Sequence, residues 1–331
     1  MLVLVAPGQG AQKPGFLSPW LDLPGVTERL TWWSAVSGLD LIHYGTKADE
    51  EEIRDTAVAQ PLLVAAGLVA AHALFSDGTG APAGPAASAH RLGAAAGHSV
   101  GEITAAALSG VLTDEAAMVL VRRRGLAMAE AASRTETGMA AILGGEQDEV
   151  VAHLEKHGLT PANVNGAGQI VAAGTAEQLA ALAEDKPEGV RRVVPLKVAG
   201  AFHTDHMTPA VATLEALVPG VPVADPRTAY VSNRDGKVVT SGAEVIERLV
   251  AQVSNPVRWD LCMETFQQLG VTGLIELAPG GTLTGIAKRA LPGVVNVPLK
   301  SPDDLDAARA LIAEHADPAA DTPAEQELRD A

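Results

Sequence analysis

The stretch "AAAGHSVGEI", residues 94–103, carries the local pattern from which the fold can be worked out. A weakly apolar run over 92–96 ends at a G-x-S-x-G pentapeptide, and an alanine-rich run over about 100–109 follows. Strand, sharp glycine turn and helix in this order are typical of an elbow that exposes its central serine, here Ser99. A chain with 33 glycines also produces this pentapeptide by chance, so the strand and helix context is what favours the elbow.

The segments around the elbow alternate between strand and helix patterns. An apolar run over 2–6 predicts a buried strand that leads into a glycine loop, and an apolar helix is expected over 56–75, interrupted near Pro61. Later elements are expected as strands at 229–233 and 273–280 and as helices at 241–253, 258–270 and 282–291. The predicted fold class is therefore α/β, with an α/β-hydrolase-like large domain built on a mostly parallel sheet.

The middle of the chain has a different order of predicted strands and helices. Its predicted elements are a strand at 138–144, a helix at 148–158, strands at 159–165 and 169–174, a helix at 175–185 and a strand at 191–198. The order βαββαβ is that of a ferredoxin-like unit. We expect residues 131–197 to form this small subdomain, inserted into a large domain of residues 1–130 and 198–315. The acidic tail, 316–331, is expected to be disordered.

Composition excludes several classes of protein. The formal net charge of −16 does not suit a nucleic-acid binder, which needs a basic surface for phosphate contacts. Cys262 is the only cysteine, which excludes an internal disulfide framework and fits a reducing compartment. No Cys/His cluster has zinc spacing, so no metal site is expected, and the N-terminal apolar run is too short for a signal peptide or a membrane span. A soluble cytoplasmic protein is expected.

If Ser99 is a nucleophile, it needs a base. Six of the nine histidines lie in segments that look solvent-facing: His43, His72, His90, His153, His157 and His315. His98 adjoins the serine on a tight turn, would point away from it, and is most simply a hydrogen-bonded structural residue. In "VAGAFHTDHM" at 198–207, His203 is the better candidate and His206 an outer or surface residue. Asp205 is too close in sequence to orient His203, so we expect a dyad whose histidine is held by a backbone group.

Three consecutive arginines at 122–124 read most simply as a solvated basic face. Each residue advances about 100° around a helix, however, which places Arg124 on an apolar stripe and Arg122 and Arg123 to either side of it. A buried guanidinium requires a partner, most naturally a carboxylate held by two parallel hydrogen bonds. That carboxylate is either a structural Asp or Glu, or the free carboxylate of a substrate attacked by Ser99.

Seven motifs together resemble the malonyl-CoA:acyl carrier protein transacylase family, the acyltransferases of fatty-acid and polyketide synthesis. They occur in the family's order nearly from end to end, so the set is far more specific than any single motif. The motifs are "PGQGAQ" (7–12), "GHSVGE" (97–102), "RRRG" (122–125), "NVNGAGQIVAAG" (163–174), "GAFHTDHM" (200–207), "QVSNPVRW" (252–259) and "ELAPGGTLTGIAKR" (276–289).

The resemblance implies a role for each matching residue. Ser99 is similar to the family's acylated serine, His203 to its base, and Arg124 to the arginine that clamps the malonyl carboxylate. Further matches are Gln9 and Val100, whose amides would form the oxyanion hole, Gln252, whose carbonyl would orient the histidine, and Phe202, which resembles the malonyl-preferring version of its motif. Asn163 and Asn165 are candidates to face the pantetheine arm, with a structural role at the strand end as the alternative.

The implied reaction is a ping-pong transfer of malonyl from malonyl-CoA to the phosphopantetheine thiol of acyl carrier protein, with no cofactor and as a monomer. The acidic carrier would need a local basic surface, for which the candidates are Arg191, Arg192 and Lys197, or Lys288 and Arg289; surface solubility explains them equally well. Two rivals remain: a serine esterase or thioesterase with water as acceptor, and a catalytically idle module that binds carrier protein. Intact Ser99, His203 and Arg124 argue against the idle module.

Overall fold

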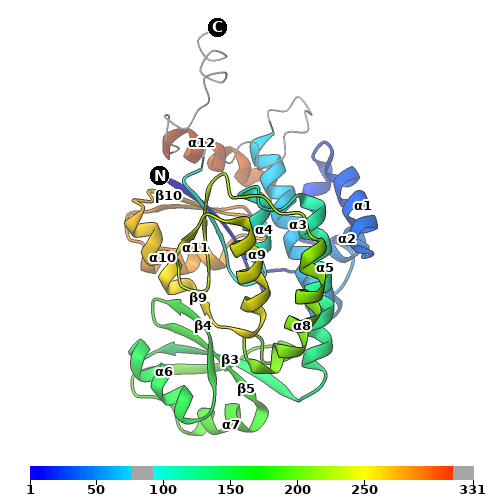
Figure 1. The fold of residues 1–331 in the computed structure, drawn as a ribbon. Coiled ribbons are helices and arrows are strands. Elements are labelled where there is room, and N and C mark those ends of the chain that lie inside the picture. Colours follow the sequence, from blue (N-terminus) through cyan, green and yellow to red (C-terminus); the bar gives the residue numbers. More distant parts are fainter. Residues whose placement is uncertain (77–91, 316–331) are drawn as a thin grey trace.

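The computed structural model describes residues 1–76 and 92–315, which form a mixed α/β fold with two sheets (Figure 1). The strands of the larger sheet are β1 (Leu2–Ala6), β2 (Ala94–Gly97), β7 (Ala229–Val231), β8 (Val238–Val239), β10 (Gly273–Glu276) and β11 (Val295–Pro298). Those of the smaller sheet are β3 (Thr137–Gly144), β4 (Thr160–Gly166), β5 (Gln169–Thr175), β6 (Val190–Pro195) and β9 (Val257–Arg258). The α-helices are α1 (Val26–Ser37), α2 (Leu41–Thr46), α3 (Thr56–Phe75), α4 (Gly101–Leu108), α5 (Asp114–Ala132), α6 (Gln147–Lys156), α7 (Ala176–Glu184), α8 (Thr208–Leu217), α9 (Gly242–Ala251), α10 (Trp259–Gln268), α11 (Thr282–Ala290) and α12 (Leu305–His315).

The larger sheet has the order β11-β10-β1-β2-β7-β8, and its pairs are parallel except β7 with β8. Side chains of β1 alternate between its two faces: Leu2 and Leu4 join the core under α3, α4 and α5, while Val3 and Val5 join the core under α10 and α11. Both faces are therefore covered, which explains why β1 is apolar at every position. The predicted, mostly parallel, covered sheet is confirmed.

Helix α3 continues through Pro61, so the expected interruption was wrong. A proline inside a helix removes the hydrogen bond to the carbonyl four residues earlier, which here belongs to Ala57. The Nη1 atom of Arg122 on α5 donates to that carbonyl oxygen at 2.6 Å, so the missing partner is replaced by a side chain from the neighbouring helix. Helix α3 is long and apolar enough to cross a membrane. Its most apolar 18-residue stretch is 89% buried inside the protein, however, as expected of a core helix.

His72 on α3 is buried, which contradicts its expected solvent-facing position. Because α3 is covered on all sides, a polar residue near its end must find a partner inside the protein. The Nε2 atom of His72 lies 2.6 Å from an Oδ2 atom of Asp114, the first residue of α5.

The smaller sheet has the order β6-β3-β5-β4-β9. Four of its strands and the helices α6 and α7 follow the predicted order βαββαβ along 137–195 and lie at the lower end of the molecule in Figure 1. The fifth strand, β9, comes from the motif at 252–259 and pairs in parallel with β4. This strand was not predicted, because a strand of two residues is too short to show an alternation of apolar and polar side chains. The expected tail at 316–331 and His90 lie outside the described residues.

Candidate active site

Ser99 lies on a strained turn between β2 and α4. Its φ angle is 54°, a left-handed conformation that is unusual for a residue other than glycine. A Cβ atom on Gly97 would overlap with the backbone of Gly101, and one on Gly101 would overlap with the carbonyl of Ala6. The two glycines therefore let the turn close against β1, and the serine hydroxyl points into a cleft.

His203 lies beside Ser99, with its Nε2 atom 2.7 Å from the serine Oγ. Its other ring nitrogen, Nδ1, is 2.8 Å from the backbone carbonyl oxygen of Gln252. Since a carbonyl only accepts, Nδ1 carries the proton and Nε2 is left as the acceptor for the serine hydroxyl. Within the described residues no carboxylate bonds to the ring, so serine and histidine form a dyad held by a backbone group.

The site keeps His203 neutral. Burial, followed by the positive charge of Arg124, lowers the pKa of His203 to about 3. An imidazole that is neutral at physiological pH can take a proton from a serine hydroxyl without first losing one of its own.

Arg124 is buried on α5, as its place on the apolar stripe predicts, while Arg123 is exposed and Arg122 half-buried. Its Nη1 donates to Oε1 of Gln60 at 2.7 Å and its Nη2 to Oε1 of Gln252 at 2.9 Å. The Nη2 atom is also 3.4 Å from the Oγ of Ser99. Burial lowers the pKa of Arg124 to about 10, which leaves it protonated at neutral pH.

No protein carboxylate contacts Arg124 directly in the described part of the chain. Across 1–76 and 92–315, no Asp or Glu oxygen comes within 4.0 Å of its guanidinium, whose hydrogen bonds go to neutral oxygens instead. Glu102 acts on the guanidinium through its charge and through Gln252, which bonds to both residues, but it makes no direct contact with Arg124. A buried cation beside Ser99 whose direct partners are two neutral amide groups suits an anionic ligand.

The backbone amides of Gln9 and Val100 border the same cleft. Gln9 lies in the loop after β1. Val100 is the residue immediately before α4, and the backbone amides at the start of a helix have no acceptor within that helix. Neither amide has a hydrogen-bond acceptor among the described residues. Two unpaired donors next to a serine hydroxyl are the groups that stabilise a developing oxyanion.

The cleft has a volume of about 240 Å³ and brings the predicted residues together from distant parts of the chain. Eight of the nine predicted site residues border it: Gln9, Ser99, Val100, Arg124, Asn163, Asn165, Phe202 and His203. Gln252, the ninth, reaches the site through its hydrogen bonds. The Oδ1 atom of Asn165 is 2.8 Å from Nε2 of His98, so His98 is a hydrogen-bonded neighbour rather than a second base.

Three polar residues that support the site were not predicted. Asn233, which follows β7, accepts a hydrogen bond from the Ser99 amide at 2.8 Å and donates to the Gly97 carbonyl at 2.7 Å. Glu102 accepts from the Asn233 amide and from the Gln252 side chain, and burial raises its pKa to about 7. Gln60 orients Arg124. A signal existed for Glu102, which stands inside the "GHSVGE" motif, but none for the other two.

Known proteins resemble the chain along nearly its whole length. The family described as "Acyl transferase domain" matches residues 3–310. The malonyl CoA-acyl carrier protein transacylase of Mycobacterium tuberculosis strain H37Rv is 50% identical over 306 residues, which cover 92% of this chain and 98% of the relative. The crystal structure of MCAT from Mycobacterium tuberculosis superposes with a TM-score of 0.86 at 49% identity, covering 93% of this chain and 99% of that one.

A second solved structure shows a relative with its partner. It is a type II PKS acyl-carrier protein in complex with its malonyl-transacylase, and it matches with a TM-score of 0.85 at 30% identity, covering 93% of this chain and 99% of that one. The match to the family and the identity to its curated members both extend over more than nine-tenths of the chain. The chain therefore belongs to the acyl transferase family, in the group that contains the malonyl CoA-acyl carrier protein transacylases.

Proposed function

We propose that the protein transfers the malonyl group from malonyl-CoA to the phosphopantetheine thiol of acyl carrier protein, through a malonyl ester of Ser99. The observation that carries the proposal is the buried guanidinium of Arg124, 3.4 Å from the Ser99 hydroxyl and with no protein carboxylate in direct contact with it in the described residues. The names of the curated relatives and the carrier-protein complex of a 30% identical neighbour support the same substrates.

In the first half-reaction, Nε2 of His203 takes the hydroxyl proton while Oγ of Ser99 attacks the thioester carbonyl. The amides of Gln9 and Val100 hold the oxyanion. When the carbonyl re-forms, the carbon–sulfur bond breaks and the CoA sulfur leaves with the proton from His203. In the second half, His203 takes the proton of the pantetheine thiol and the sulfur attacks the carbonyl carbon of the malonyl ester. The bond between that carbon and Oγ of Ser99 then breaks, and His203 returns the proton to Oγ. The steps that we propose use no metal and no cofactor.

Arg124 would select the acyl group. Its two terminal nitrogens are already oriented by Gln60 and Gln252, and a malonyl carboxylate can accept from both in parallel. Phe202, adjacent to His203 and bordering the cleft, would crowd a branch at the second carbon of the acyl group. Asn163 and Asn165 border the cleft along β4, where they would face the pantetheine arm; the hydrogen bond of Asn165 to His98 also supports a structural role.

The acidic carrier protein would dock on a local basic surface of the enzyme. Arg191 and Arg192 on β6 and Lys288 and Arg289 on α11 are exposed. Lys197 lies 3.7 Å from Glu50, which makes it the weakest of the five candidates. We place the enzyme in the cytoplasm as a monomer, a proposal that rests on its single cysteine and on a cleft completed by one chain.

We also assign the architecture more finely. Residues 1–130 and 198–315 would form an α/β-hydrolase-like large domain, supported by its parallel sheet and by the serine elbow at the end of β2. Residues 131–197 would form an inserted ferredoxin-like subdomain, supported by their βαββαβ order. The cleft lies between them, since it is bordered by residues of both.

The dependence of kcat/KM on pH between 8 and 5 tests whether His203 is neutral. Because its pKa is about 3, His203 stays neutral from pH 8 to pH 5, and kcat/KM for acylation should not fall through its protonation. A histidine with an ordinary pKa of about 6.5 would lose roughly thirtyfold in kcat/KM at pH 5. Rates should be measured by stopped flow within the pH range in which the protein stays folded.

Glu102 is the control for that profile, because its pKa of about 7 falls inside the same range. A fall in kcat/KM near pH 7 that disappears in Glu102→Gln belongs to Glu102. A fall near pH 6.5 that persists in Glu102→Gln would mean that His203 titrates normally, in contradiction to its buried environment.

Intact-mass spectrometry tests the intermediate directly. After brief incubation with malonyl-CoA and no carrier protein, the chain should gain the mass of one malonyl group, and peptide mapping should place it on the peptide containing Ser99. Adding phosphopantetheinylated carrier protein should remove the adduct and place it on the carrier. No adduct on Ser99 would reject the proposal, and an adduct lost to water as fast as to the carrier would favour the thioesterase.

A further inference from the structure

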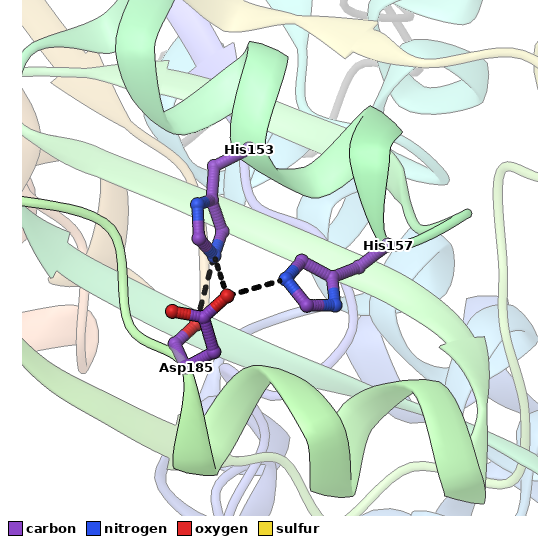
Figure 2. Close-up of side chains that lie close together, drawn as sticks. All are labelled: His153, His157 and Asp185. Carbon is purple, nitrogen blue, oxygen red and sulfur yellow. Dashed lines mark hydrogen bonds and ion pairs between the residues drawn. The ribbon is translucent and has the colours of Figure 1, made fainter.

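A cluster of three possible metal ligands lies on the small sheet's helices, away from the cleft. His153 and His157 stand one helical turn apart, on the last turn of α6 and just after it, and Asp185 follows the last residue of α7 (Figure 2). The two imidazoles and the carboxylate point toward one another in Figure 2. The His-x₃-His spacing puts both rings on one helix face, and the fold brings the acid to that face.

The ligand atoms are spaced for a tetrahedral metal ion. Adjacent ligands of a zinc ion bound at about 2.0–2.1 Å lie about 3.3 Å apart. In the structure the Oδ2 atom of Asp185 is 3.6 Å from Nε2 of His153 and 3.0 Å from Nε2 of His157. All three ligand atoms lie within 4.8 Å of one another. Small side-chain rotations would therefore bring each pair of them to the spacing of about 3.3 Å that a zinc ion requires.

The surroundings favour a cation with an open coordination position. The cluster stands at the C-terminal ends of two helices, where the unpaired carbonyls concentrate negative charge. Both rings are largely covered, with side-chain exposures of 17% and 19%, whereas Asp185 is 60% exposed and leaves access for an ion. Two features oppose binding: the positive charge of Lys156, and the hydrogen bond that Nε2 of His153 donates to the carbonyl oxygen of Asp185 at 2.8 Å, which an ion would have to displace.

We propose that His153, His157 and Asp185 form a Zn²⁺ site with three protein ligands and a fourth, solvent-filled position. Imidazole and carboxylate ligands suit zinc, and the bound ion would tie the end of α6 to the end of α7. To bind, Nε2 of each ring must be free of its proton, which moves to Nδ1 in the neutral ring. The expectation of no metal site missed this cluster because Asp185 is 28 residues from His157.

Isothermal titration with ZnCl₂ at neutral pH, on the full chain without a histidine tag, tests the site. The wild type should bind one ion per chain and melt at a higher temperature when the ion is present. His153→Ala, His157→Ala and Asp185→Asn should each weaken binding more than about tenfold, because even outer-shell partners of a metal change its affinity by 10- to 100-fold. His43→Ala, which removes a histidine on α2, should bind as the wild type does.

Cobalt substitution adds a readout that a merely structural role of these residues would not move. Co²⁺ in the wild type should show the intense visible bands of a tetrahedral ion, and the double variant His153→Ala/His157→Ala should lack them. Circular dichroism should show that each variant is folded. The proposal is overturned if the wild type binds no Zn²⁺, or if the double variant binds it as tightly as the wild type. Neither result bears on malonyl transfer, because the cluster lies outside the catalytic cleft.

Discussion

Replacing Ser99 with alanine is expected to lower malonyl transfer to carrier protein by at least about 10⁴-fold. The substitution removes the atom that would form the proposed acyl intermediate, and His203, 2.7 Å away, is left with no serine proton to accept. In serine hydrolases the loss of the serine or the histidine costs up to about 10⁶-fold, and what remains comes from the oxyanion hole and from binding. The measurement is the initial rate of malonyl transfer to carrier protein at saturating malonyl-CoA.

The matched control is the pair His203→Ala and the double variant Ser99→Ala/His203→Ala. Residues that act as one unit are not additive, so the double variant should be about as slow as either single variant. Thermal unfolding should show that all three are folded. A Ser99→Ala variant that retains more than a hundredth of the wild-type rate would contradict the acyl-serine mechanism, as would fully additive losses.

The fold could be predicted where the sequence pattern is local. The run Leu2–Ala6 is apolar at every position because both faces of β1 are covered, and the predicted strand has the observed bounds. The βαββαβ order of 137–195 could be read because its helices α6 and α7 have one apolar face each. Elements α1, α2, α8, β11 and α12 were not assigned, and β8 and β9 have two residues each, too few to show a period.

Hydrogen bonds between residues far apart in the sequence could not be predicted from the local sequence pattern. In α3 the donor that Pro61 lacks is supplied by Arg122, 65 residues from the carbonyl that it bonds. The sequence therefore predicted a break where a neighbouring helix had in fact supplied the missing donor. His72 was misplaced for the same reason, since its partner Asp114 belongs to another helix.

The candidate site was more predictable than the fold around it, because Arg124 and the elbow can be argued from single elements. Helical geometry alone placed Arg124 on the buried stripe of α5, and glycine sterics placed Ser99 on the turn. Gln60 and Asn233 reach the site only after α3 and β7 are packed, and nothing in their own segments marks them. Glu102, Gln252 and Asn233 form a buried hydrogen-bond network. Which of them bond to one another can be seen only in the packed structure.

Replacing Arg124 with alanine is expected to lower kcat/KM for malonyl-CoA by about 100- to 4,000-fold while acetyl-CoA and simple uncharged esters lose little. Removing one partner from a buried charge pair costs about 3–5 kcal/mol, and each 1.4 kcal/mol is a factor of ten. The loss should fall on malonyl-CoA alone, because only the malonyl carboxylate needs the guanidinium. Steady-state rates with the three kinds of substrate measure the selectivity.

Arg123→Ala is the matched control for Arg124→Ala, since Arg123 stands next to it on α5 but is exposed, and it should leave all three rates unchanged. Arg124→Lys should recover only part of the malonyl rate, because an ammonium cannot make two parallel hydrogen bonds to a carboxylate. Equal losses with malonyl-CoA and uncharged esters would mean that Arg124 supports the fold of the cleft, through Gln60 and Gln252, rather than selecting the acyl group. Full malonyl activity in Arg124→Ala would exclude the carboxylate clamp and leave the choice of acyl group to the shape of the cleft around Phe202.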